Sequence, residues 1–177
     1  MQTFSKYFTN DIIDSKQKLK PLILITDFEN KLVLALSQDS EQIYDNNGNM
    51  IDFITCIDKV SNIKISNDYD SKTLKINRLR CTLYNYYDVN TKLSEYINNN
   101  FINHNMYLYY KSPTTNIINL DGSGGDYDCA LVYNGAISRI VHNEKNIQIT
   151  AEDKTELQIS DKTVPYMSID KLPTDIE

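Results

Sequence analysis

The chain has 177 residues and a mass of 20.5 kDa, which suits one domain, and its 41% hydrophobic and 24% charged residues are the balance of a folded protein. A net charge of −6 and a pI near 4.9 argue against a dedicated nucleic-acid-binding protein and against a protein held on membranes by a basic surface. The apolar runs are far shorter than the ~20 residues that span a bilayer, and residues 1–20 lack an apolar stretch of signal-peptide length, so we expect a soluble protein made in the cytoplasm without a membrane anchor.

Residues 1–20 are polar and are interpreted as an N-terminal arm. Phe4, Phe8 and Ile12 recur at intervals of four residues. That spacing fits one face of a short helix, and it fits the docking contacts of an extended arm equally well, so both interpretations stay open.

A series of short apolar segments predicts β-strands along the first half of the chain. Residues 21–26 and 31–37 are too short for ordinary helices and suit the two buried strands of a hairpin. The sequence Asp45-Asn-Asn-Gly-Asn49 predicts a turn, because Asn and Gly tolerate positive φ. Further strands are expected at residues 52–57, 62–66 and 73–84. In the last of these the alternation changes phase between Asn77 and Arg78, which indicates a β-bulge or a strand that changes faces.

One helix is expected over residues 91–102, where Leu93, Ile97 and Phe101 lie four apart and Asn90 or Thr91 precedes them as a cap. Further strands are predicted at residues 106–111, 130–133, 136–141, 146–152 and 157–159, with Asn134-Gly135 between the second and third and a hairpin turn at residues 143–146.

Many short strands and one short helix predict a mainly β fold, a sandwich or a barrel. We assign this β domain to residues 21–168. Residues 169–177 are interpreted as a C-terminal tail or as the start of a linker to further domains.

The cysteines Cys56, Cys81 and Cys129 are odd in number and widely separated, so neither a zinc site nor a disulfide framework is predicted. Buried free thiols are the simplest interpretation. Asp128 beside Cys129 and His142 downstream raise the hypothesis of a Cys/His nucleophile. Because Cys129 opens an apolar strand, we favour a packed thiol.

The glycine-rich segment 121–128 offers oxygen ligands from Asp121, Ser123, Asp126 and Asp128, as a calcium loop does. Their spacing does not follow the EF-hand pattern and no glutamate closes the site, so a solvated loop is the simpler interpretation. Asp121, Asp126 and Asp128 stay as calcium candidates, and no other metal and no cofactor is predicted.

Two acidic pairs, Asp68 with Asp70 and Glu152 with Asp153, have the composition of acid–base partners, although solvated strand ends explain them more simply. Tyrosines crowd the middle of the chain: Tyr84, Tyr86, Tyr87, Tyr96, Tyr107, Tyr109 and Tyr110. Tyrosine suits a sheet surface and a protein interface alike, so both interpretations stay open. No active site is predicted.

Several segments between residues 58 and 168 carry a resemblance to a known family. They include Asp58-Lys-Val-Ser61, Asn77-Arg-Leu-Arg-Cys-Thr-Leu-Tyr-Asn-Tyr-Tyr-Asp88 and Tyr109-Tyr-Lys-Ser-Pro-Thr-Thr115, and they continue in residues 93–97, 131–140, 149–156 and 164–166. These segments resemble the tail-tube-like first domain of tail hub, or baseplate hub, proteins of tailed bacteriophages. They are structural sequences without a catalytic signature.

The resemblance implies a ring-forming β-barrel at the end of the tail tube, in which residues 131–140 and 149–156 form a hairpin entered through a tight Gly turn. Such rings pass DNA and the tape-measure protein through a lumen without binding DNA specifically. A net negative chain fits that task, because like charge discourages phosphates from adhering. Family members usually continue into further domains, so the chain is expected to be a minimal version or part of a larger product.

We therefore expect a structural protein of the virion tail and not an enzyme. It is expected to form a homo-oligomeric ring, a trimer or a hexamer, between the tail tube or distal tail protein and the tip or fibre proteins. Its subunits are expected to join by β-sheet continuation, supported by apolar and tyrosine contacts. The alternative is a carbohydrate- or receptor-binding β-sandwich with an exposed aromatic shelf and calcium in segment 121–128.

Overall fold

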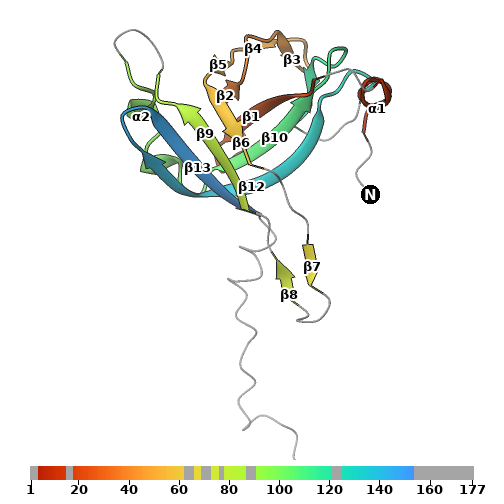
Figure 1. The fold of residues 1–177 in the computed structure, drawn as a ribbon. Coiled ribbons are helices and arrows are strands. Elements are labelled where there is room, and N and C mark those ends of the chain that lie inside the picture. Colours follow the sequence, from red (N-terminus) through yellow and green to blue (C-terminus); the bar gives the residue numbers. More distant parts are fainter. Residues whose placement is uncertain are drawn as a thin grey trace, which may run out of the picture.

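The computed structural model describes residues 4–14, 18–61, 66–68, 73–75, 78–86, 91–120 and 125–153. Within these ranges the protein is mainly β, as predicted, with an eight-stranded and a three-stranded mixed sheet and a separate two-stranded hairpin (Figure 1). The strand predicted at residues 157–159 and the tail at 169–177 lie outside the described residues. No described helix is long and apolar enough to cross a membrane.

The strands of the eight-stranded sheet are β1 (Lys20–Thr26), β2 (Leu32–Ser37), β5 (Ile54–Thr55), β6 (Ile57–Val60), β9 (Arg78–Tyr84), β10 (Asn105–Lys111), β12 (Ala130–His142) and β13 (Asn146–Asp153). The three-stranded sheet holds β3 (Ile43–Asp45), β4 (Met50–Ile51) and β11 (Ile117–Ile118). The hairpin consists of β7 (Ser66–Asp68) and β8 (Thr73–Lys75). The predicted hairpin turn between β12 and β13 is confirmed by a hydrogen bond from the Asn143 amide to the Asn146 carbonyl.

The eight-stranded sheet is strongly curved, and its order is β5-β2-β1-β10-β12-β13-β9-β6 (Figure 1). Its two outermost strands, β5 and β6, follow one another in the chain with only Cys56 between them. The Cys56 amide donates to the Ser37 carbonyl of β2, and the Cys56 carbonyl accepts from the Tyr84 amide of β9. Because β5 and β6 lie in series on one segment, they do not pair with each other. The fold is mainly β as predicted, but the sheet is not closed, so the barrel form of the prediction is not met.

Two apolar cores explain why the sequence of β1 is a continuous hydrophobic run. Ile23 and Ile25 of β1 point into the core enclosed by the curved sheet. Leu22 and Leu24, on the opposite face of β1, pack in a second core that Ile43 of β3 and Ile118 of β11 also join. A strand covered on both faces needs apolar residues at every position.

The predicted break at Asn134-Gly135 is wrong, because β12 continues through it from Ala130 to His142. A Cβ atom on Gly135 would lie 2.4 Å from the Glu152 carbonyl oxygen and 2.6 Å from the Tyr133 hydroxyl. Glycine is therefore required here by the close approach of neighbouring atoms within a sheet, and no turn is formed.

The predicted helix over residues 91–102 is also too long. The chain forms only α2 (Leu93–Tyr96) and the 3-10 turn Asn99–Phe101. Asn98 between them has extended backbone, and its side chain accepts a hydrogen bond from the Asn100 amide. This local bond competes with helix continuation, as Asn side chains commonly do. The arm, in contrast, contains the helix α1 (Lys6–Ile13), which buries Phe8 but leaves Ile12 exposed.

Candidate functional site

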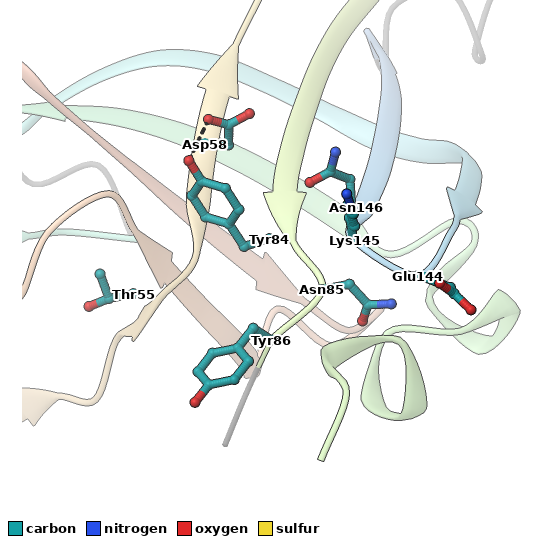
Figure 2. Close-up of a pocket in the computed structure, with 8 residues that line it drawn as sticks. All are labelled: Thr55, Asp58, Tyr84, Asn85, Tyr86, Glu144, Lys145 and Asn146. Atoms are coloured by element: carbon teal, nitrogen blue, oxygen red, sulfur yellow. Dashed lines mark hydrogen bonds between the residues drawn. The ribbon is translucent and has the colours of Figure 1, made fainter. Parts of the chain in front are cut away.

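A surface pocket of about 720 Å³ lies where β9 ends, beside β5, β6 and the turn between β12 and β13 (Figure 2). Its walls come from three parts of the chain: Thr55 and Asp58, then Tyr84, Asn85 and Tyr86, then Glu144, Lys145 and Asn146. The pocket therefore depends on the correct pairing of β6, β9 and β13.

Asn85 holds these parts together. Its side-chain amide donates to the Asn143 carbonyl at 2.8 Å, and its side-chain oxygen accepts from the Ser94 amide at 2.8 Å. Its backbone amide donates to the Lys145 carbonyl. Asn85 is buried, so it fixes the β12–β13 turn and the start of α2 against the end of β9.

Tyr84 and Tyr86 flank Asn85 and point to the opposite side of the strand, with 52% and 60% of their surface exposed. The Tyr84 hydroxyl donates to an Asp58 carboxylate oxygen at 2.8 Å, which fixes its ring in the pocket (Figure 2). This hydrogen bond, together with the charge of Asp58, raises the pKa of Tyr84. The pocket thus offers two aromatic rings beside carboxylate, amide and ammonium groups.

The other predicted tyrosines divide between core and surface. Tyr109 is buried in the second core, and burial raises its pKa well above the usual range. Tyr107 and Tyr110 are partly buried, Tyr96 on α2 is 52% exposed, and Tyr87 lies outside the described residues. Burial therefore separates Tyr109 from the exposed tyrosines, and the interface interpretation of the exposed ones stays a prediction.

The hairpin β7–β8 connects β6 to β9 and lies away from the eight-stranded sheet (Figure 1). Its strands pair antiparallel over Ser66–Asp68 and Thr73–Lys75, and no described residue outside the hairpin pairs with either strand. The phase change predicted between Asn77 and Arg78 falls at the start of β9, and Asn77 lies outside the described residues.

Cys129 and His142 are not brought together. Cys129 is buried just before β12 begins, whereas His142 is the exposed last residue of that 13-residue strand. Burial raises the pKa of the Cys129 thiol to about 12. Cys56 and Cys81 are also buried, and burial raises both of their thiol pKa values.

Of the calcium candidates, Asp121 lies outside the described residues. Asp128 accepts a hydrogen bond from the Gly125 amide at 2.5 Å, and the Asp126 carbonyl accepts from the Tyr7 amide of α1. The rings of Tyr7 and Tyr127 stack at 4.5 Å. The described part of this segment therefore serves as a docking point for α1, and no group of three or more metal-ligating side chains occurs among the described residues.

The acidic pairs stay hypotheses. Glu152 forms an ion pair with Arg78 at 3.1 Å across β9 and β13. Asp70 and the side chains of Asp68 and Asp153 lie outside what the structure describes.

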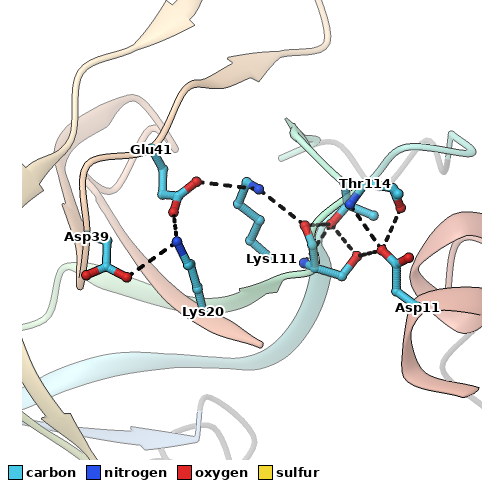
Figure 3. A network of polar contacts seen from close by, with 8 residues as sticks. Asp11, Lys20, Asp39, Glu41, Lys111 and Thr114 are labelled. Carbon is cyan, nitrogen blue, oxygen red and sulfur yellow. Dashed lines mark hydrogen bonds and ion pairs between the residues drawn. The ribbon is translucent and has the colours of Figure 1, made fainter. Parts of the chain in front are cut away.

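A second polar cluster, not predicted from the sequence, connects α1 to the sheet (Figure 3). One Asp11 carboxylate oxygen accepts from the Ser112 and Thr114 hydroxyls, each at 2.5 Å, and from the Thr114 amide at 3.1 Å. These hydrogen bonds lower the pKa of Asp11. Asp11 follows Phe8 by three residues, which places both on the same face of a helix. A carboxylate on the apolar face of the arm could therefore have indicated a buried polar contact.

The cluster continues through charged residues. Lys20 and Lys111 are opposite each other in the β1–β10 register, and the Glu41 carboxylate lies between them. Lys111 is 3.4 Å from Glu41 and also donates to the Ser112 carbonyl at 3.2 Å, while Lys20 is 3.4 Å from Asp39. Each of these charges has a partner within the chain.

A scan against models of known protein families finds no match to this chain, and a search of curated proteins finds none either.

Proposed function

We propose that the protein is a structural ring subunit of a phage tail, a hub or baseplate protein of the tail-tube type that works by assembly without turnover. The observation that carries this proposal is the hairpin β7–β8, which has no strand partner among the described residues. An isolated two-stranded hairpin is at best marginally stable in water. A strand contributed by a neighbouring subunit would satisfy its unpaired backbone groups.

The position of the hairpin supports the same proposal. It is inserted between β6 and β9, which pair directly with each other. The strand pairing of the eight-stranded sheet therefore does not depend on the hairpin. The curved sheet with its outermost strands joined at Cys56 is compatible with the barrel-like body that the family resemblance implies. A closed ring built by sheet continuation would also remove the exposed strand edges that favour aggregation.

The first test is the solution mass of the purified protein by light scattering, with negative-stain images of the same sample. Closed rings of fixed stoichiometry with a central hole are expected. A protein that stays monomeric up to about 1 mM contradicts the proposal, because only contacts weaker than that would then remain.

A hairpin-deletion variant identifies the contact. Val60 and Cys81 are partners in the β6–β9 register, so replacement of residues 64–77 by Asn-Gly lets a two-residue turn join these strands. This variant should keep the circular dichroism spectrum and lose the ring. The control is Phe28→Ser in the exposed β1–β2 turn, which should leave both unchanged. Rings of unaltered mass without the hairpin would overturn this mode of assembly.

A second candidate function, saccharide binding, is favoured by the pocket. The half-exposed rings of Tyr84 and Tyr86 lie beside Asp58, Glu144 and Asn146, and such aromatic surfaces with neighbouring polar groups suit the apolar faces and hydroxyls of a neutral sugar. A glycan array with and without calcium tests it. Tyr84→Ala with Tyr86→Ala should abolish any binding, whereas Tyr96→Ala, an equally exposed tyrosine outside the pocket, should not.

A further inference from the structure

All of the arginines of this acidic chain, Arg78, Arg80 and Arg139, lie on one face of the eight-stranded sheet. Arg80 of β9 and Arg139 of β12 are both register partners of Thr150, which lies on β13 between them. The neighbouring residues of β9 and β13 are buried in the core, so alternation directs this row outward. We call Arg80, Thr150 and Arg139 the arginine row.

The arginines differ in how they are paired. Arg78 is held by Glu152 at 3.1 Å. No described residue forms an ion pair with Arg80 or Arg139, and both are exposed. Lys59 is a register partner of Thr82, so it lies on the same outward face of β6 and β9. Glu152, which the register places beside this row, is therefore already in use, and Asp58, at the Tyr84 end of the same face of β9, accepts the Tyr84 hydroxyl.

The rest of the chain has the opposite charge. Lys59, the arginines and Glu152 together carry +3, which leaves −9 on the remainder of a chain whose total is −6. Residues 32–58 contain five acidic residues and no Lys or Arg. Among these, Asp52 is exposed directly after β4, whereas the half-exposed Asp45 carboxylate accepts from the Asn47 and Asn49 amides within the β3–β4 turn. Figure 1 shows β3 and β4 at the top of the molecule, with β12 and β13 below.

We propose that the arginine row is a carboxylate-binding surface that receives the acidic β3–β4 hairpin of a second copy of this chain. The inference rests on the proposed ring function and specifies which faces meet. Guanidinium groups suit this role because they bind carboxylates through two parallel hydrogen bonds.

The charge distribution also limits how two subunits can meet. A twofold axis through the arginine row would bring it against itself, and such like-charge contacts are costly. The contact must therefore join two different faces. Where each pair of subunits shares a single contact of this kind, the contact is heterologous and generates closed rings or open filaments, as the proposed ring function requires.

Nucleic acid is a poorer occupant of the same surface. The surface carries four cationic side chains and one carboxylate, which is fewer cations than typical DNA-binding proteins place against phosphates. The net charge of −9 on the rest of the chain also repels a long polyanion such as DNA. The second copy offers short, local negative charge instead.

The experiment is self-association of the full chain by light scattering over protein concentration, at low and high salt. Arg80→Glu with Arg139→Glu should weaken association at least about tenfold, and Asp52→Lys should weaken it by a smaller factor. Combining all three substitutions should recover part of the loss. Arg80→Gln with Arg139→Gln, which only removes charge, should give an intermediate result, and circular dichroism checks that each variant folds.

The matched control is Lys31→Glu with Lys92→Glu, two exposed lysines elsewhere whose reversal changes the net charge equally. It should leave association nearly unchanged. If the Arg80/Arg139 variants form rings as tightly as the unaltered chain, the inference is wrong while the ring function stands. If the unaltered chain forms only monomers or twofold dimers, both are wrong. Binding of a short DNA duplex that depends on Arg80 and Arg139, with self-association unaffected, would assign the surface to nucleic acid and overturn the inference.

Discussion

The polar cluster that runs from Asp11 through Lys111, Glu41 and Lys20 to Asp39 and the arginine row show two ways in which this chain places charge. In the cluster, Lys20, Glu41 and Lys111 form a continuous chain of ion pairs, and Glu41 and Lys111 are only 11% and 12% exposed. In the arginine row, Arg80 and Arg139 are exposed and have no carboxylate among the described residues. Lys20 and Lys111 of the cluster lie on the same eight-stranded sheet as the arginine row.

The difference separates charges that fix the subunit from charges that are available to a partner. A largely buried charge without a partner is destabilising, so Glu41 and Lys111, the least exposed charges of the cluster, depend on each other. An exposed charge is solvated by water and costs little when left unpaired. Substitutions in the cluster should therefore change the stability of the subunit, and substitutions in the arginine row should change its associations.

The largest expected effect comes from Glu41→Ala. It leaves the Lys111 ammonium, which is only 12% exposed, without its carboxylate, and breaking a largely buried pair costs up to about 3 kcal/mol. Urea denaturation measures the loss in the free energy of unfolding. Glu29→Ala in the exposed β1–β2 turn is the control and should change this free energy by less than about 0.5 kcal/mol. Equal losses in the two variants would mean that the Glu41 ion pairs do not stabilise the subunit more than an exposed carboxylate does.

Asp11→Ala should have the next largest effect. The substitution leaves the buried Ser112 hydroxyl and the Thr114 amide without their anionic acceptor, and hydrogen bonds to a charged group are worth about 2 kcal/mol. Asp14→Ala, at the exposed end of the same helix, is the matched control. Native-state hydrogen exchange should show α1 opening more readily in the first variant only.

The same carboxylate gives a pH dependence of defined sign. The pKa of Asp11 is lower in the folded protein than its ordinary value of 3.8, so the folded state holds this proton less tightly than the unfolded state does. The stabilisation by Asp11 is complete above that ordinary value and is lost as the pH falls through the lower, folded pKa. Unfolding free energies measured from pH 5 to pH 2 should fall less steeply for Asp11→Ala than for the unaltered chain.

Local patterns in the sequence predicted most of the strands and the buried thiols. The hairpin of β1 and β2 and the turns at Asp45–Asn49 and Asn143–Asn146 follow from residue types that act over a few positions. Of the two clearest errors, one has a non-local cause and the other a local one. Gly135 resembles a turn glycine, but its role is to make room for the Glu152 carbonyl on another strand. The helix after Thr91 is interrupted at Asn98, where a side-chain bond replaces helix continuation.

The site was less predictable than the fold. The exposed tyrosines were recognised as a group, but only the β9–β13 and β6–β9 pairings bring Tyr84 and Tyr86 together with Asp58 and Asn146. The arginine row was not recognised, because residues 80 and 139 are far apart in sequence and become neighbours of Thr150 only through the strand register. The Asp11 cluster depends on a helix docking against a turn more than a hundred residues away.

A kinetic prediction follows from the position of Cys129. All of the thiols are buried, and burial raises the pKa of Cys129 to about 12, so thiol reagents at pH 8 should react only when the structure opens. The Ser5 hydroxyl of the arm donates to the Asp128 carbonyl next to Cys129. Asp11→Ala should therefore speed the labelling of Cys129, measured by mass spectrometry of peptides, and leave Cys81 in the main core unchanged. Equal acceleration at both thiols would mean global unfolding instead of release of α1.

The smallest expected change in the free energy of unfolding comes from the arginine row. Arg80→Ala with Arg139→Ala should change the free energy of unfolding of the isolated subunit by less than about 0.5 kcal/mol, because neither guanidinium forms an ion pair with a described residue. Arg78→Ala, which breaks an exposed ion pair, should cost no more than about 1 kcal/mol. A loss above about 2 kcal/mol in the double variant, measured by urea denaturation of the monomer, would show that the arginine row stabilises its own sheet. A negligible loss in stability combined with weakened association would mean that these side chains act between subunits, because a substitution that leaves the folded monomer unchanged can weaken assembly only at a contact surface.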